Sequence, residues 1–264
     1  MTELLPLLVF TTFGGIAAGA YAVSAFKALI PTSGKAGEQA GFAAHKPWLF
    51  PLVCIVLLGI GLLGTLAHLG QPLRFINGML NPGSMISQES YWAISFGLLM
   101  AIDLALVWFK GVSSKVVRTL GAVAACGMMV VTGLAYYRCA FIDVWASTLT
   151  VPLFVVGDIA MGVGLCMLFT RIDAYERALH GADIVVAVVW LCTTVAFALH
   201  MAACDQSVAV VAAGAIVGPV AAGILSACVM RGALKADKAG YAILALAFIG
   251  VVVIRGAFFA AGVL

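Results

Sequence analysis

Charged residues are scarce in this chain of 264 residues. Only 9% of the residues are Asp, Glu, Lys or Arg, whereas 64% are hydrophobic, and the mean hydropathy is +1.16. A soluble domain carries roughly a quarter charged residues. The chain therefore lacks the polar surface of a water-soluble globular protein, and we predict an integral membrane protein.

The alternation of apolar and polar residues that is typical of a membrane β-barrel is also missing. The apolar runs are continuous and about 20 residues long, the length of a helix that crosses a hydrocarbon core of ~30 Å. We predict an all-α integral membrane protein in which eight transmembrane helices form one membrane domain over residues 1–264. The expected spans are residues 4–30, 48–69, 91–109, 116–137, 150–170, 182–203, 207–230 and 241–263.

Lysine and arginine are distributed unevenly over the predicted connections. An even number of spans places both termini on one side, where the connections hold only Arg74 and Arg138. The connections of the other side hold Lys27, Lys35, Lys46, Lys110, Lys115, Arg118, Arg171, Arg177, Arg231, Lys235 and Lys238. Because cytoplasmic loops are enriched in Lys and Arg, we expect both termini on the outer side of the membrane. The net charge of +3 therefore indicates topology, and we expect no nucleic acid as partner.

Cysteine and histidine spacing gives no pattern that is typical of a metal site. The seven cysteines form no CxxC pair, so we expect no iron–sulfur cluster in this chain. Cys139 and Cys204 are expected on the same side, as a disulfide or as two free thiols. A haem held by His68 and His200 is a less favoured alternative, because the other two histidines, His45 and His180, are expected in connections on the opposite side.

Ionisable and polar side chains gather near the outer ends of the predicted spans. Asp158 lies about two turns, roughly 12 Å, inside the fifth span, and Arg255 lies about two turns from the outer end of the eighth. The other members of this level are His68, Glu89, Tyr136, Tyr137, Arg138, His200 and Asp205. Ionisable groups in a membrane are costly and usually face the bundle interior or a cavity, so we predict a shared pocket there. Only Asp103 lies clearly in the inner half, and we assign it no role.

Each of these residues also has a purely structural interpretation. Asp158 and Arg255 would pair as a buried ion pair whether or not they serve a reaction. Glu89 is a favourable acid for a helix N-terminus, and the two outer histidines would suit the headgroup region. Aromatic residues expected in the interfacial belt are Tyr91, Trp92, Tyr137 and Trp145. The small-residue patterns "GIAAG" and "GAIVG" predict close helix–helix contacts.

Two polar stretches carry a resemblance to a known family. "HLGQPLR" (His68–Arg74) followed by "NPGSMISQE" (Asn81–Glu89) resembles the anchor-subunit family of dimethyl sulfoxide reductase (DmsC-type). That family has a His-Leu-Gly-x-Pro-x-Arg run and a Ser-x-Leu-Ser-x-Glu element before the third span; here Ile86 replaces the leucine. "IRGAFF" (Ile254–Phe259) is similar to the family's Arg-Gly-x-Phe-aromatic element in the last span.

The resemblance implies a function in electron transport. Such subunits anchor a molybdopterin catalytic subunit and a four-cluster ferredoxin-like iron–sulfur subunit to the membrane, oxidise a quinol, usually menaquinol, and carry no haem. The resemblance also implies a bacterial cytoplasmic (inner) membrane with both termini and the catalytic partner on its outer, periplasmic side. This agrees with the orientation expected from the lysine and arginine counts. The terminal substrate depends on the catalytic partner and is not encoded in this chain.

The chemistry of quinol oxidation suggests roles for the candidate residues. The reaction releases two electrons and two protons, and an imidazole is suited to bind a quinol oxygen and accept a proton. His68 and Glu89 are the candidate catalytic residues, with Glu89 passing the proton to the outer water. The candidate quinol-binding residues are His68, Arg74, Glu89, Tyr137, Asp158 and Arg255. Competing interpretations are a polysulfide-reductase (NrfD-type) quinone subunit, a transporter with polar residues through the full membrane depth, and a purely structural anchor.

Overall fold

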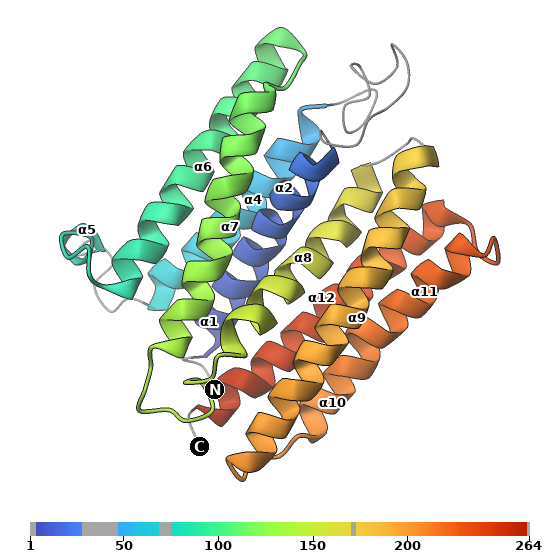
Figure 1. Ribbon diagram of the computed structural model, residues 1–264. Helices are drawn as coiled ribbons and strands as arrows, with labels where there is room; N and C mark the ends of the chain where they lie inside the picture. The colour runs from blue at the N-terminus through green and yellow to red at the C-terminus, as the bar shows by residue number, and fades with distance from the viewer. Residues whose placement is uncertain (1–3, 28–46, 69–74, 170–172, 263–264) are drawn as a thin grey trace.

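The computed structural model describes residues 4–27, 47–68, 75–169 and 173–262, and these residues form a bundle of long helices that run up and down (Figure 1). No strand occurs within these four ranges. The helices are α1 (Leu5–Val9), η1 (Phe10–Gly14), α2 (Gly15–Lys27), α4 (Leu49–His68), α5 (Phe75–Gly78), α6 (Met85–Lys110), α7 (Lys115–Tyr137), α8 (Thr150–Phe169), α9 (Asp173–Ala203), α10 (Ala209–Ala215), η3 (Ile216–Val220), α11 (Ala221–Met230) and α12 (Ala236–Ala261).

Eight of the helical segments are long and apolar enough to cross a membrane, which confirms the predicted all-α fold with eight spans. The first span combines α1, η1 and α2, and the seventh combines α10, η3 and α11. Both η1 and η3 are π-helical turns, and η3 contains Pro219, which cannot donate the backbone hydrogen bond of a regular helix. Each of these spans therefore has one widened turn.

Three helices begin at least five residues before the predicted apolar runs. One is α12, which begins at Ala236 instead of Tyr241, and the other two are α6 and α9. The apolar run of the third span begins at Tyr91, but α6 begins at Met85 after Ser84, whose extended backbone ends the preceding loop. The apolar run of the sixth span begins at Ala182, but α9 begins at Asp173. In both cases a polar stretch continues the helix beyond the apolar run, since hydropathy marks the part within lipid rather than the helix end.

This extension overturns the expected position of His180. The sequence predicts it in a connection, whereas it lies in α9 and is 1% exposed. Asp183, one turn later, is 2% exposed, and the sequence did not indicate a buried acid there. The half of the bundle that contains Asp103 therefore holds further buried polar groups.

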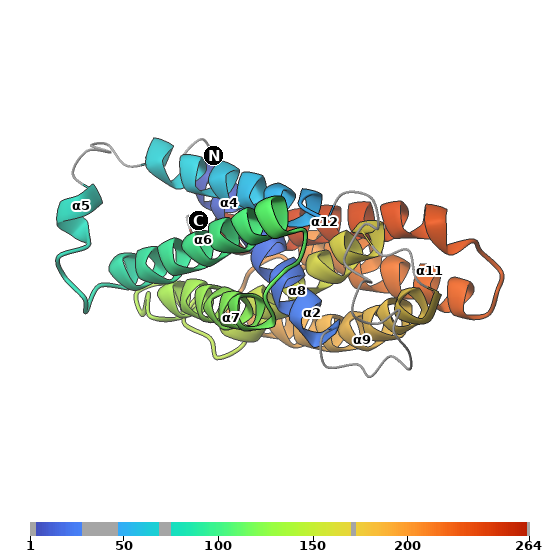
Figure 2. The same ribbon diagram turned by 90° about the horizontal axis from the view of Figure 1, so that it is seen from above.

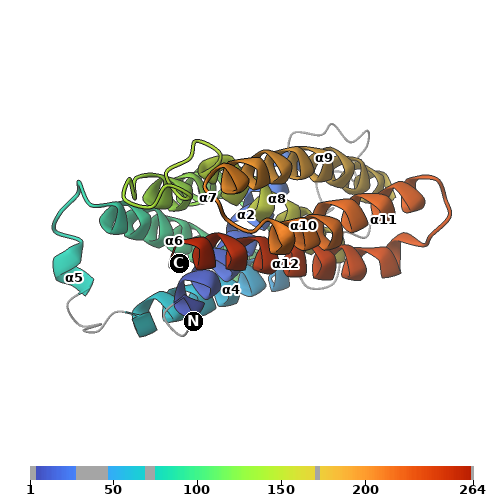
Figure 3. The same ribbon diagram turned by 90° about the horizontal axis from the view of Figure 1, so that it is seen from below.

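The bundle has two groups of helices that meet along α2 and α8. α2 packs on α4, α7 and α8, whereas α8 also packs on α9 and α12 (Figures 1 and 2). α1 begins and α12 ends at the same end of the bundle, which we call the terminal end; the other end is the opposite end (Figure 1). The short helix α5 projects beyond the bundle at the terminal end, as the view from below also shows (Figure 3). Which end faces outward stays a prediction.

Glycine allows α2 and α8 to approach closely. A Cβ atom on Gly19 would lie 1.9 Å from the backbone oxygen of Asp158, and one on Gly162 would lie 2.2 Å from the backbone carbon of Gly19. Only backbone lies at these points, so no side chain can move aside. The close contact predicted for "GIAAG" is confirmed, and small residues at such contacts are typical of membrane helices.

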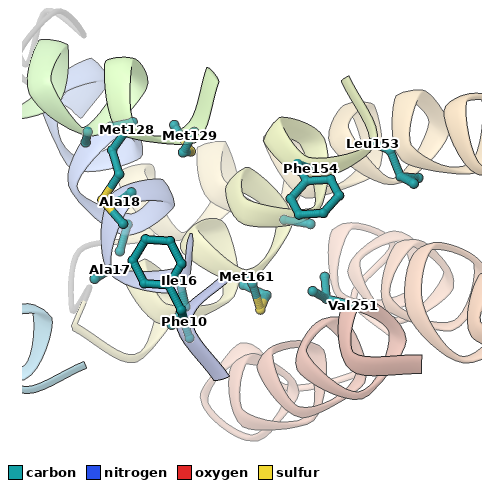
Figure 4. Packing of buried hydrophobic residues seen from close by; sticks show 14 of the residues in the cluster. Phe10, Ile16, Ala17, Ala18, Met128, Met129, Leu153, Phe154, Met161 and Val251 are labelled. Atoms are coloured by element: carbon teal, nitrogen blue, oxygen red, sulfur yellow. The ribbon is translucent and has the colours of Figure 1, made fainter. Parts of the chain in front are cut away.

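Apolar side chains fill the space around this contact. Phe10 and Ile16 of the first span face Met128 of α7 and Met161 of α8, and Val251 of α12 closes the cluster (Figure 4). In lipid such packing stabilises through dispersion and shape rather than through removal from water. These side chains come from four spans, so the cluster joins the two groups of helices.

Candidate functional site

Asp158 and Arg255 form a buried ion pair at the terminal end of the bundle. Arg255 Nη2 lies 2.6 Å from Asp158 Oδ1, and both side chains are at most 3% exposed. The same guanidinium donates to the carbonyl oxygens of Phe154, at 2.9 Å, and Thr11. The pairing expected from the sequence is therefore present, and its link to a quinol stays a prediction.

The first span is shaped to receive this pair. Thr11 lies in the π-helical turn η1, and such turns recur at functional sites. Gly15 follows directly, and a Cβ atom there would lie 1.9 Å from Asp158 Oδ1 and 3.2 Å from Arg255 Nη1. Only glycine leaves room for the carboxylate and the guanidinium at this position.

Aromatic rings cover the pair on the side of α7. Tyr136 is 8% exposed, and its ring centroid lies 5.3 Å from that of Phe154 and 5.2 Å from that of Phe259. The guanidinium carbon of Arg255 lies 4.6 Å from the centroid of Phe154, a cation–π distance. Tyr136 therefore belongs to the aromatic cover of the pair and comes from the same face of α7 as Thr132.

The structure corrects the expected position of Trp145. The sequence predicts it in the interfacial aromatic belt, but it is 8% exposed and its indole Nε1 donates to the carbonyl of Phe258 at 2.8 Å. Its ring stacks on Phe258 at 5.5 Å between centroids. Trp145 therefore closes the aromatic cluster from the loop between α7 and α8, because its N–H finds a backbone partner inside the protein.

Glu89 lies in the second turn of α6 rather than in its first turn. It is the fifth residue of the helix, and the first turn contains no acid. The side chain is partly buried and lies beside Thr132 of α7, which stands one turn before Tyr136 on the same face. The interpretation as an N-terminal helix acid is therefore wrong, and Glu89 faces the α7 side of the site.

The hydroxyl of Thr132 lies beside the Glu89 carboxylate. Among the described residues, Thr12 Oγ1 of η1 is a buried hydroxyl with no hydrogen-bond partner. Buried polar atoms without a partner are uncommon and call for a ligand, a water molecule or strain. On the α6–α7 side of the site, the Glu89 carboxylate and the Thr132 hydroxyl are the polar groups that lie together.

Tyr137 and Tyr136 point in different directions, because consecutive residues on a helix are about 100° apart. Tyr137 is 38% exposed, whereas Tyr136 is buried. The sequence singles out Tyr137 as a candidate ligand and leaves Tyr136 without a role. The spacing Thr132–Tyr136 (i, i+4) was the feature that could have identified the inner face.

The motif residues of the second connection are only partly described. α4 ends at His68, at the terminal end, but the His68 side chain lies outside the described residues, as does Arg74. The helix ends therefore bring the backbone of His68 and Glu89 to the same end of the bundle. Contacts of the imidazole and of Arg74 stay predictions.

His200 lies apart from the ion pair. Its Nε2 is 3.2 Å from the carbonyl oxygen of Asp143 and 3.9 Å from Cys204 Sγ. Cys139 and Cys204 are both free thiols, which decides between the two alternatives for this pair. Among the described residues no group of three His, Cys, Asp or Glu side chains could hold a metal ion.

Asp103, to which the sequence assigns no role, is the centre of a polar network at the opposite end. The carboxylate is fully buried and lies 2.8 Å from Arg118 Nη2. Tyr21 donates to its Oδ2 at 2.5 Å, and Ser113 donates to its Oδ1. This network ties α2, α6 and α7 together and indicates a structural role.

Comparison with known proteins identifies the family. A family model described as the DMSO reductase anchor subunit (DmsC) matches residues 1–256. The C subunit of the anaerobic dimethyl sulfoxide reductase of Haemophilus influenzae is 32% identical over 117 residues, which cover 39% of this chain and 39% of that protein. The protein of the same name from Escherichia coli is 34% identical over 116 residues, which cover 44% of this chain and 38% of that protein.

The matched stretches thus span less than half of the length of these two relatives. The family match, in contrast, extends over nearly the whole sequence, and it confirms the resemblance seen in "HLGQPLR", "NPGSMISQE" and "IRGAFF". With eight membrane-capable helices and this match, the chain belongs to the DMSO reductase anchor subunit (DmsC) family of multi-pass membrane anchors.

Proposed function

We propose that this chain anchors a molybdopterin oxidoreductase complex to the bacterial cytoplasmic membrane and oxidises menaquinol at the terminal end. The two electrons of the quinol pass to a four-cluster iron–sulfur subunit bound there, and the two protons are released to the outer water. The observation that carries the proposal is the buried Asp158–Arg255 pair, which the aromatic rings of Phe154 and Tyr136 cover. It lies toward the end of the bundle where α4 ends at His68 and where Glu89 of α6 lies beside Thr132 of α7.

In this proposal the residues nearest to the quinol are His68, Glu89 and Tyr136. His68 binds one quinol oxygen and accepts a proton, and Glu89 passes that proton outward. The phenol of Tyr136 donates to the second oxygen, and it replaces Tyr137 in this role because Tyr137 is 38% exposed while Tyr136 is buried. The hydroxyl of Thr132, which lies beside Glu89, supplies a further hydrogen bond for the quinol or for bound water.

Asp158 and Arg255 are positioning residues in this scheme rather than direct ligands. Both are nearly fully buried, and the two terminal nitrogens of Arg255 already donate to Thr11, Phe154 and Asp158. The pair fixes α8 against α12 and η1 and stabilises negative charge that develops near Tyr136. Arg74 holds the second connection in place or contacts the iron–sulfur subunit.

The terminal end also suits a partner protein. Apolar side chains that are 70–85% exposed occur there in segments outside the apolar spans: Ile76, Leu80 and Phe141. Exposed apolar groups of this kind are typical of protein–protein contacts. We assign this end to the outer side and to the iron–sulfur subunit.

A transporter is the less favoured alternative. A transport path needs polar residues through the whole membrane depth, and two polar networks do lie at the opposite end. The buried face of α8 between Asp158 and the opposite end, however, carries Ala160, Met161, Gly162, Val163, Gly164 and Leu165. This apolar stretch separates the two ends. A polysulfide-reductase (NrfD-type) subunit would use the same site chemistry, but the family match favours the DmsC assignment.

The decisive experiment compares two electron donors in the assembled complex. Glu89→Gln and His68→Leu should each lower quinol-dependent reduction by roughly 10²–10⁴-fold, the usual contribution of a general base, while reduction by a soluble artificial donor persists. His200→Gln is the matched control, since His200 lies at the same end but contacts Asp143 and Cys204. Quinol rates that stay unchanged in Glu89→Gln and His68→Leu would refute the proposal.

A further inference from the structure

A second buried polar cluster lies at the opposite end of the bundle, between α9 and α11. His180, Asp183 and Ser226 are 1%, 2% and 0% exposed. Ser226 Oγ donates to Asp183 Oδ2 at 2.7 Å, and His180 Nδ1 lies 3.2 Å from the same Oγ. A hydroxyl has one proton to donate, so with Asp183 ionised Nδ1 carries a proton and donates to Ser226.

This cluster borders an open cleft. The cleft has a volume of about 330 Å³ and is lined by Glu176, Arg177, His180, Val229, Met230, Gly232, Leu234 and Ala236. These residues belong to the start of α9, the end of α11, the following loop and the start of α12. They therefore lie where three spans end, at the level at which lipid headgroups meet water.

The charge around the cleft is mainly positive. Arg177 lines it, and exposed Arg231, Lys235 and Lys238 occupy the loop between α11 and α12 and the start of α12. Glu176 is the single acidic side chain in the described lining. Basic pockets between helix ends are a common form of binding site for anionic lipid headgroups.

We propose that this cleft binds the phosphate group of an anionic phospholipid, with Arg177 and His180 as hydrogen-bond donors. Ser226 holds Nδ1 of His180, which leaves Nε2 as the ring nitrogen for the ligand. In the imidazolium form both ring nitrogens donate, and Asp183 supplies the compensating negative charge through Ser226. Val229, Met230 and Leu234 give an apolar wall for the glycerol and the first acyl carbons.

Asp183 and Ser226 act as positioning residues, because a buried partner that fixes one nitrogen of an imidazole orients the other. The site lies at the opposite end from Glu89 and Tyr136 and uses none of the residues of the quinol proposal. Either proposal can therefore fail without the other.

The test uses the full-length chain in lipid nanodiscs of phosphatidylcholine with increasing phosphatidylglycerol. Native mass spectrometry measures bound phosphatidylglycerol, and a thermal scan measures its effect on Tm. Arg177→Gln should weaken phosphatidylglycerol binding about tenfold, the loss expected for one charged hydrogen bond. Ser226→Ala should weaken it as well and leave the rest of the lining intact. Lys115→Gln is the matched control, since Lys115 is exposed at the same end but on α7 and outside the cleft lining.

Three outcomes would overturn the proposal. Equal weakening in Arg177→Gln and Lys115→Gln would mean that only general surface charge attracts the lipid. An unchanged affinity in Ser226→Ala would remove the positioning role of the buried cluster. Inorganic phosphate that raises Tm and displaces phosphatidylglycerol at equal concentration would assign the cleft to a free phosphate ion instead of a lipid.

Discussion

Replacing Gly15 by alanine tests the packing that supports the Asp158–Arg255 pair. The new Cβ atom would lie 1.9 Å from Asp158 Oδ1, whereas real contacts of a Cβ atom essentially never fall under 3.0 Å. The carboxylate or the helix must therefore retreat by about 1.1 Å, the difference between these two distances. A shift of this size is enough to weaken the hydrogen bond between Asp158 and Arg255, which is 2.6 Å long.

The expected loss of stability follows from overpacking. Such changes cost about 1–3 kcal/mol, and a buried ion pair that breaks adds to this. For a chain of this size 1 kcal/mol lowers Tm by about 2–4 °C, so Gly15→Ala should lower Tm by roughly 2–12 °C. A dye that reacts with thiols reports unfolding, because Cys54 and Cys166 are buried in the folded chain.

Gly256→Ala is the matched control for this measurement. Gly256 is the neighbour of Arg255 on α12, and a Cβ atom there would meet no atom within 4 Å. Its Tm should stay within about 1 °C of the parent value, since surface-like substitutions change stability little. Equal Tm values for Gly15→Ala and Gly256→Ala would refute the packing argument.

Further predictions concern the site, the opposite end and the thiols. Tyr136→Phe should lower the quinol-dependent rate at least tenfold, while Tyr137→Phe should leave this rate within about twofold of the parent value. The measurement is the steady-state rate with a soluble quinol analogue. A larger loss in Tyr137→Phe than in Tyr136→Phe would restore Tyr137 as the quinol ligand. Asp103→Asn should lower Tm by several degrees without changing the quinol rate per folded complex, because it removes the negative charge that faces Arg118, Tyr21 and Ser113; a quinol defect with an unchanged Tm would contradict this. Burial raises the pKa of the Cys139 thiol, and only the thiolate reacts with alkylating reagents. Alkylation of Cys139, followed by mass spectrometry, should therefore be slower at pH 7–8 than that of a small free thiol and should accelerate as the pH rises. A rate equal to that of the free thiol would show that the Cys139 side chain is exposed to solvent. Vesicles with the reconstituted complex should show no net charge movement during turnover, because protons are released and consumed on the same side, and a voltage-sensitive dye that responds in step with turnover would exclude this arrangement.

Hydropathy was sufficient to predict the all-helical class and the eight membrane-capable helices of this chain, whereas the orientation expected from charge stays a prediction. Continuous apolar runs predict eight helices because no other backbone conformation satisfies its hydrogen bonds in lipid. They did not predict where α6 and α9 begin, since the polar stretches at Met85 and Asp173 form helix outside the apolar runs. His180 was misplaced for this reason.

The sequence was sufficient to predict how deep in the membrane the site residues lie, but not which way each side chain points. The level of Asp158 and Arg255 follows from counting residues along each span, and their pairing follows from the cost of isolated charge in a membrane. Whether Tyr136 or Tyr137 faces inward depends on the rotation of α7, which the close packing of its neighbours sets. The exposed position expected for Trp145 was wrong because its loop folds back over Phe258.

Photolabelling tests the central claim most directly. A menaquinone analogue with a photoreactive group, bound to the assembled complex and mapped by mass spectrometry, should label peptides at the end of α4, the start of α6 and the end of α7. Excess menaquinol should suppress this labelling, and Glu89→Gln should reduce it. Labelling confined to the α9–α11 end, or spread evenly over the lipid-facing helices, would contradict the assignment of the quinol site to the terminal end.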